Sequence, residues 1–102
     1  MAVTKKILRN QITKVEGLIN DYTSLEASDV EASEVAEKLE DNTTLLLAGY
    51  ISWINSYRPN KEVVEILKEL DSKLLMAEEG SVVLDVANRT VKFVEFCVFD
   101  KD

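Results

Sequence analysis

The 102-residue sequence contains no histidine, and this absence excludes several kinds of catalytic and metal site. Without histidine the chain has no Ser-His-Asp or Cys-His arrangement, no zinc site with histidine ligands and no HExxH motif. Its one cysteine, Cys97, can form neither an internal disulfide nor a thiolate cluster. Cys97 stands between two apolar residues, so we interpret it as a small, buried hydrophobic side chain.

Glycine is also scarce, with three residues in the whole chain. Gly17, Gly49 and Gly80 stand too far apart to form a phosphate-binding loop, and neither GxGxxG nor a Walker A motif occurs. The segment EASDVEASEVAE lacks the Asp/Asn alternation before a glycine that a calcium-binding EF-hand loop needs. Paired carboxylates are interpreted as solvated helix faces, because nothing beside them predicts a raised pKa. The sequence therefore predicts a protein that is not an enzyme and that uses no cofactor and no metal.

Long hydrophobic runs are absent as well. No stretch of 18 or more apolar residues occurs, and no apolar run follows a basic start as in a signal peptide. We therefore expect no membrane partner and a cytoplasmic location. With 46% hydrophobic and 30% charged residues, the chain has the composition of a folded globular protein and the length of one domain. Residues 1–102 are thus predicted to form a single domain.

The charge is distributed unevenly along the chain. The net charge is −7, and between Glu16 and Asp41 nine acidic residues stand against one basic residue, Lys38. The first fifteen residues instead carry four basic and no acidic residues. Because nucleic-acid phosphates are bound by clustered Lys and Arg, we expect no direct nucleic-acid binding by the acidic segment. A basic protein surface is the partner that this segment favours.

The spacing of apolar residues predicts three helices. The second keeps its apolar stripe in phase through residues 41–44, so we favour one continuous helix that ends before Pro59. A break at residues 41–44 is the alternative, since Asn and Thr are good caps. In the third helix Asn60 is a candidate N-cap, and Gly80 is a candidate left-handed C-cap. The expected ranges are about 4–22, 28–58 and 60–79.

The C-terminal segment SVVLDVANRTVKFVEFCVF is rich in β-branched and aromatic residues, with apolar residues often two apart. We interpret it as two strands, at about 82–87 and 90–99, joined by a two-residue turn at Asn88-Arg89. In this register Asp85 faces Lys92, which makes an opposite-charge cross-strand pair. The predicted fold class is therefore α+β, mainly helical, with a C-terminal β-hairpin.

Residues 26–35 repeat one phrase, EASDV followed by EASEV. Ser28 and Glu31 match a capping box, and the helix dipole favours acidic residues in a first turn. The dipole effect has faded beyond that turn, so the later acidic residues need another explanation. We interpret the acidic residues of this region as a partner-binding surface, formed by Glu26, Asp29, Glu31, Glu34, Glu37, Glu40 and Asp41.

Near the end of the second predicted helix, three aromatic residues and a cation form a ladder. This composition suits stacking on a base or anchoring a protein partner. Core packing is the alternative, and we favour it because these side chains continue the apolar stripe of the helix. The four residues are Tyr50, Trp53, Tyr57 and Arg58.

Two features predict self-association. The second predicted strand has more apolar length than the first can pair, and an exposed apolar strand edge is normally covered. The basic start of the chain is also separated from the acidic segment, so a two-fold partner would bring the two together. We therefore expect a homodimer or a higher homo-oligomer, with Phe93, Phe96 and Phe99 at its interface.

Together these features predict a small, acidic, non-enzymatic interaction protein. It would act as an inhibitor or adaptor whose acidic helical surface binds a basic site on a protein partner. One alternative is a structural homo-oligomer, such as an assembly or scaffold component, in which the acids only maintain solubility. Another is a binder of a small ligand or nucleotide through the aromatic ladder.

Overall fold

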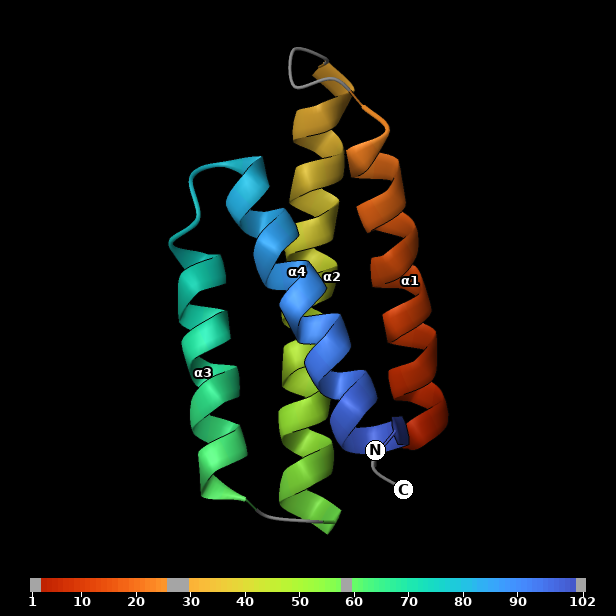
Figure 1. Cartoon of the computed structure of the whole chain (residues 1–102), viewed down its shortest axis with the longest axis vertical. Coiled ribbons are helices and arrows are strands. Elements are labelled where there is room, and N and C mark those ends of the chain that lie inside the picture. The colour runs from red at the N-terminus through yellow and green to blue at the C-terminus, as the bar shows by residue number, and fades with distance from the viewer. Residues whose placement is uncertain (1–2, 26–29, 58–59, 101–102) are drawn as a thin grey trace.

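The computed structural model describes residues 3–25, 30–57 and 60–100, which form four α-helices and a short π-helix (Figure 1). No strand occurs in these three stretches, so the predicted α+β class and its C-terminal β-hairpin are wrong. The elements are α1 (Lys5–Thr23), α2 (Val30–Tyr57), α3 (Lys61–Leu75), α4 (Gly80–Glu95) and the π-helix Phe96–Asp100.

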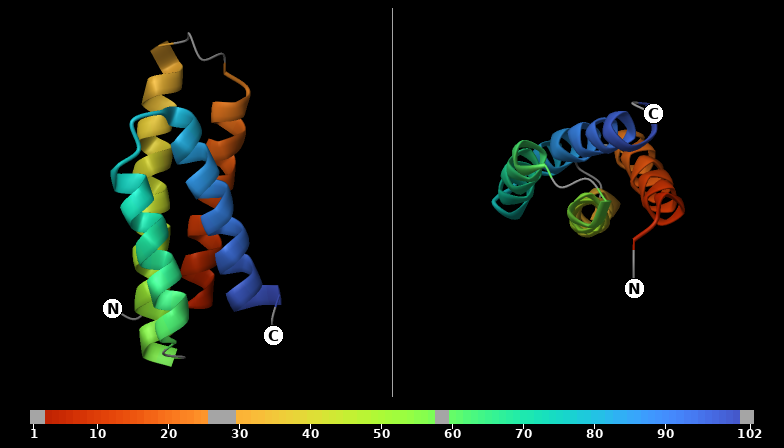
Figure 2. Two further views of the ribbon diagram at one scale, coloured as in Figure 1. Left: turned by 60° about the vertical axis from the view of Figure 1, so that its left-hand side comes forward. Right: turned by 90° about the horizontal axis from the view of Figure 1, so that it is seen from below.

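Helix α2 is the central element of the bundle. It contacts α1, α3 and α4, and α4 also packs against both α1 and α3. Seen end on, α3, α4 and α1 form an arc around one side of α2 (Figure 2). The hydrophobic side chains facing into this arc form the core, contributed by all four α-helices and the π-helix.

Helices α1 and α3 begin with the caps that their sequences provide. The Thr4 hydroxyl accepts a hydrogen bond from the Ile7 amide at 3.2 Å. The Asn60 side chain accepts from the amides of Glu62 and Val63 at 3.0 and 3.3 Å, which confirms its predicted role as an N-cap. Helix α3 ends at Leu75, however, and not near residue 79 as predicted.

Helix α2 is continuous through residues 41–44, as the phase of its apolar stripe predicts. Three polar side chains in this stretch donate hydrogen bonds to backbone oxygens one turn earlier: Asn42 to Lys38, Thr43 to Leu39 and Thr44 to Glu40, at 2.7, 2.7 and 2.9 Å. Because they are satisfied inside the helix, they do not act as caps that would end it. The predicted Ser28 cap and the predicted end at Pro59 lie outside the described residues.

Residues 80–95 form α4 because their buried side chains recur every three or four positions. Asp85 pairs with Arg89, one turn later on the same helix, at 3.5 Å, and not with Lys92 as the hairpin would require. Asn88, the predicted turn residue, donates to the Leu84 carbonyl oxygen at 3.0 Å. Gly80 starts α4 and is not a left-handed C-cap, since no described residue has positive φ. The buried residues of α4 are Val83, Val86, Ala87, Thr90, Val91 and Val94.

Candidate functional site

Five of the seven acidic residues predicted to bind a partner lie on α2. Four of these side chains are exposed, and Glu40 is half-buried. The other two predicted residues, Glu26 and Asp29, lie outside the described residues. The five on α2 are Glu31, Glu34, Glu37, Glu40 and Asp41.

Helix α3 ends at Leu75, and other residues therefore face the N-terminal half of α2. The C-terminal half of α2 lies beside α3, where Asn55 and the α3 residues Lys61 and Val64 line a common depression. Glu37 precedes Asn55 by five helical turns and therefore points in the same direction. Glu37, however, lines a pocket with Ala77 and Glu79, from the segment that joins α3 to α4, and not with residues of α3.

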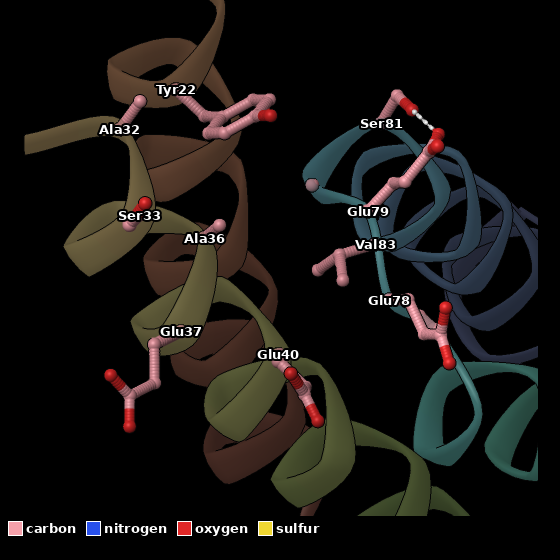
Figure 3. A pocket seen from close by; sticks show the side chains of 12 residues that line it. Tyr22, Ala32, Ser33, Ala36, Glu37, Glu40, Glu78, Glu79, Ser81 and Val83 are labelled. Carbon is pink, nitrogen blue, oxygen red and sulfur yellow. Dashed lines mark hydrogen bonds between the residues drawn. The ribbon is translucent and has the colours of Figure 1, made fainter. Parts of the chain in front are cut away.

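A notch of about 510 Å³ occupies this space between α2, the start of α4 and the segment that joins α3 to α4. Figure 3 shows small side chains from α2 on one side and the residues around the start of α4 on the other. We call it the acidic notch. It is lined by Tyr22, Ala32, Ser33, Ala36, Glu37, Glu40, Ala77, Glu78, Glu79, Gly80, Ser81 and Val83.

Four glutamates give the acidic notch its charge. Glu37 and Glu40 come from α2, while Glu78 and Glu79 come from the segment before α4, on the opposite side of the opening (Figure 3). Glu79 accepts a hydrogen bond from the Ser81 hydroxyl at 3.4 Å. The notch thus combines two acids that the sequence predicts for a binding surface with two that it does not.

No basic side chain within the described stretches forms an ion pair with these four glutamates. Two ion pairs on α3 and α4 join Lys73 with Glu69 and Arg89 with Asp85, each at 3.5 Å. Both join residues one turn apart on an exposed helix face and are worth a few tenths of a kcal/mol. Among the described residues, the four carboxylates of the notch therefore have no basic partner.

The Tyr22 side chain reaches from α1 to the first residue of α4. Its hydroxyl lies where a Cβ atom on residue 80 would stand, so only glycine fits at Gly80 without a shift of the ring. This contact ties the end of α1 to the start of α4 along the edge of the acidic notch. Side-chain packing thus fixes one edge of the acidic notch.

The predicted aromatic ladder lies mostly in the core. Tyr50 is fully buried and Trp53 is 8% exposed, with their ring centroids 6.0 Å apart. Tyr57 is exposed and packs against Trp53, whereas Arg58 lies outside the described residues. Burial raises the pKa of the Tyr50 hydroxyl, and its hydrogen bond with Cys97 raises this pKa further.

The three phenylalanines predicted at an oligomer interface lie in different environments. Phe93 is half-buried, with its ring centroid 6.1 Å from that of Tyr50. Phe99 is half-buried beneath the Arg9 guanidinium, which lies 3.7 Å from the ring centroid. Phe96 is 57% exposed. Of the three, Phe96 presents the most apolar surface to another molecule.

Comparisons with protein-family models, curated proteins and solved structures found no match to this chain. In the described parts of the chain, no helix has the length and apolar character needed to cross a membrane. Across the same residues, no three His, Cys, Asp or Glu side chains are grouped so as to hold a metal ion.

Proposed function

We propose that the protein is a non-enzymatic interaction protein, an inhibitor or adaptor, whose acidic α2 surface binds a basic site on a protein partner. One observation supports this most. Glu37 and Glu40 lie opposite Glu78 and Glu79 around an open notch, and within the described residues no cation neutralises them. Basic side chains of a partner supply the missing charge, which guides both encounter and orientation.

The test compares two variants that lose the same charge at different places. Glu34→Gln/Glu37→Gln/Glu40→Gln removes three charges from α2, and the control Glu62→Gln/Glu65→Gln/Glu69→Gln removes three from α3. The partner is first captured from extracts of cells that naturally express the protein and is then purified. Its affinity for each variant is measured. At about 0.2–1 kcal/mol per exposed contact, the loss of three contacts should weaken binding of the α2 variant roughly three- to 150-fold, and the control should bind much as the original chain does.

Salt provides a second readout of the same proposal. Raising the ionic strength from about 0.01 M to about 0.5 M shortens the screening length from about 30 Å to about 4 Å, so binding by the original chain should weaken markedly. Equal affinity of the α2 variant and the original chain at low salt would show that the acidic surface does not bind the partner.

Self-association is a second candidate function, favoured by the exposure of Phe96. The strand edge that first suggested it is not formed, since residues 90–95 belong to α4. Phe96 is nevertheless a large apolar side chain that is 57% exposed, and contact with a second copy of the chain would remove it from water. A homo-oligomer of this kind would act as a structural or scaffold component.

A further inference from the structure

We propose that the acidic notch receives a basic amphipathic helix of the partner, which lies along the N-terminal half of α2 in line with α3. This inference rests on the proposed function and specifies the shape of the partner. It concerns the face of α2 that borders the acidic notch, beyond the point where α3 ends at Leu75.

The uncovered face has the size of a short helix contact. The N-terminal part of α2, residues 30–40, spans about 16 Å, or about three helical turns. Figure 1 shows this end of α2 rising beyond the start of α4, with α1 beside it. About three turns of a partner helix would therefore contact the whole length of residues 30–40.

The floor of the notch permits close approach of a helix. Its α2 side chains, Ala32, Ser33 and Ala36, are small, and small residues allow helix axes to come within about 8–10 Å. Exposed apolar side chains stand near both limits of this face. Val30, the first residue of α2, is 82% exposed, and Met76, directly before the notch residue Ala77, is 79% exposed.

The charges around this floor select a basic helix. Glu37 and Glu40 stand on one side of the opening, and Glu78 and Glu79 on the other (Figure 3). A helix that lays an Ala- and Leu-rich stripe on the floor carries its flanking residues toward both sides. Lys or Arg at those flanks meet the glutamates, whereas an acidic helix would be repelled from both sides.

The probe is a synthetic peptide of about sixteen residues with an Ala/Leu stripe flanked by Lys on both sides. A second peptide has the same composition in an order that breaks the stripe. Ala36→Gln fills the notch without changing its charge, and the control Ala48→Gln makes the same change on an exposed face of α2 outside the notch. Affinity is measured by fluorescence anisotropy, and peptide helicity by circular dichroism.

We expect the striped peptide to become helical on binding and to bind Ala36→Gln at least about tenfold more weakly than the original chain and Ala48→Gln. The permuted peptide should bind weakly and alike to all three proteins. Equal binding of Ala36→Gln and Ala48→Gln, no binding of the striped peptide, or equal binding of both peptides would each overturn the helix proposal.

These outcomes are separable from failure of the proposed function. If the three Glu→Gln changes on α2 weaken the protein partner while Ala36→Gln does not, the acidic surface binds something other than a helix in the notch. If the Glu→Gln changes have no effect, the proposed function itself fails. If the original chain is a dimer in sedimentation and Ala36→Gln makes it a monomer, a second copy occupies the notch, which also overturns the proposal.

Discussion

Replacing Gly80 by alanine should destabilise the protein, although alanine favours helices. A Cβ on residue 80 would lie 2.8 Å from Cζ and 3.1 Å from Cε2 of Tyr22, and closer still to its hydroxyl. Carbon atoms in favourable contact stand about 3.5–4.0 Å apart, so the Tyr22 ring must move. Because Tyr22 is half-buried at the edge of the notch, moving its ring should cost about 1 kcal/mol, the low end of the range for overpacking, which exceeds the small helix advantage of alanine at the first position of α4.

Gly17→Ala is the matched control. A Cβ on Gly17 would meet no atom within 4 Å, and the residue is exposed within α1, so this change should stabilise the protein by up to about 1 kcal/mol. Urea denaturation followed by circular dichroism measures both variants. In the background of Tyr22→Ala, Gly80→Ala should cost little or nothing, because the obstructing ring is gone. Equal stabilisation by Gly80→Ala and Gly17→Ala would refute the contact that ties α1 to α4.

Three further outcomes are expected. Trp53→Ala should cost about 3–5 kcal/mol in thermal unfolding, because a large core side chain is lost, and a stable Trp53→Ala that loses only partner binding would instead make Trp53 a site residue. The raised pKa of the Tyr50 hydroxyl means that this group ionises in the unfolded chain before it does in the folded one, so stability should fall as pH rises above about 10. Tyr50→Phe should show a smaller fall, and an equal fall in both proteins would contradict the raised pKa. If the chain self-associates through Phe96, Phe96→Asp should shift sedimentation toward the monomer, and an original chain that is already monomeric would exclude this interface.

The first three helices are recognisable from apolar spacing, because a single stripe dominates each. In α1 the buried residues Leu8, Ile12 and Val15 follow the three- and four-residue spacing closely. The continuity of α2 is also predictable, since the stripe keeps its phase across residues 41–44. The side-chain hydrogen bonds that make the polar residues there compatible with a helix depend on the helix already being formed.

The C-terminal helix is mispredicted because two periods overlap in its sequence. Val82, Leu84 and Val86 alternate as in a strand, and β-branched residues favour strands when judged alone. The buried set of α4 begins at Val83 and continues at Val86 and Ala87, which is helical spacing. Packing against α1, α2 and α3 decides between the two periods, and this tertiary contact is not visible in a local window.

Two of the four glutamates of the acidic notch are predicted from the sequence, and two are missed. Glu37 and Glu40 are expected on a binding surface because they exceed what a helix start needs. Glu78 and Glu79 are missed because the interpretation of Gly80 as a C-cap extends the third helix to about residue 79. Acidic residues at the end of such a helix are interpreted as an ordinary solvated face. The early end of α3 brings these two residues to the notch, and this end depends on where α4 packs.

Zero-length cross-linking tests the acidic surface most directly. A carbodiimide joins a carboxylate to a lysine amine only when the two are in contact, and mass spectrometry then identifies the glutamates of this chain that are linked to the purified partner. We expect links at Glu34, Glu37, Glu40, Glu78 and Glu79, which lie on or beside the acidic notch. Links confined to the α3 glutamates Glu62, Glu65 and Glu69 would contradict the proposal that the partner binds at the acidic α2 surface.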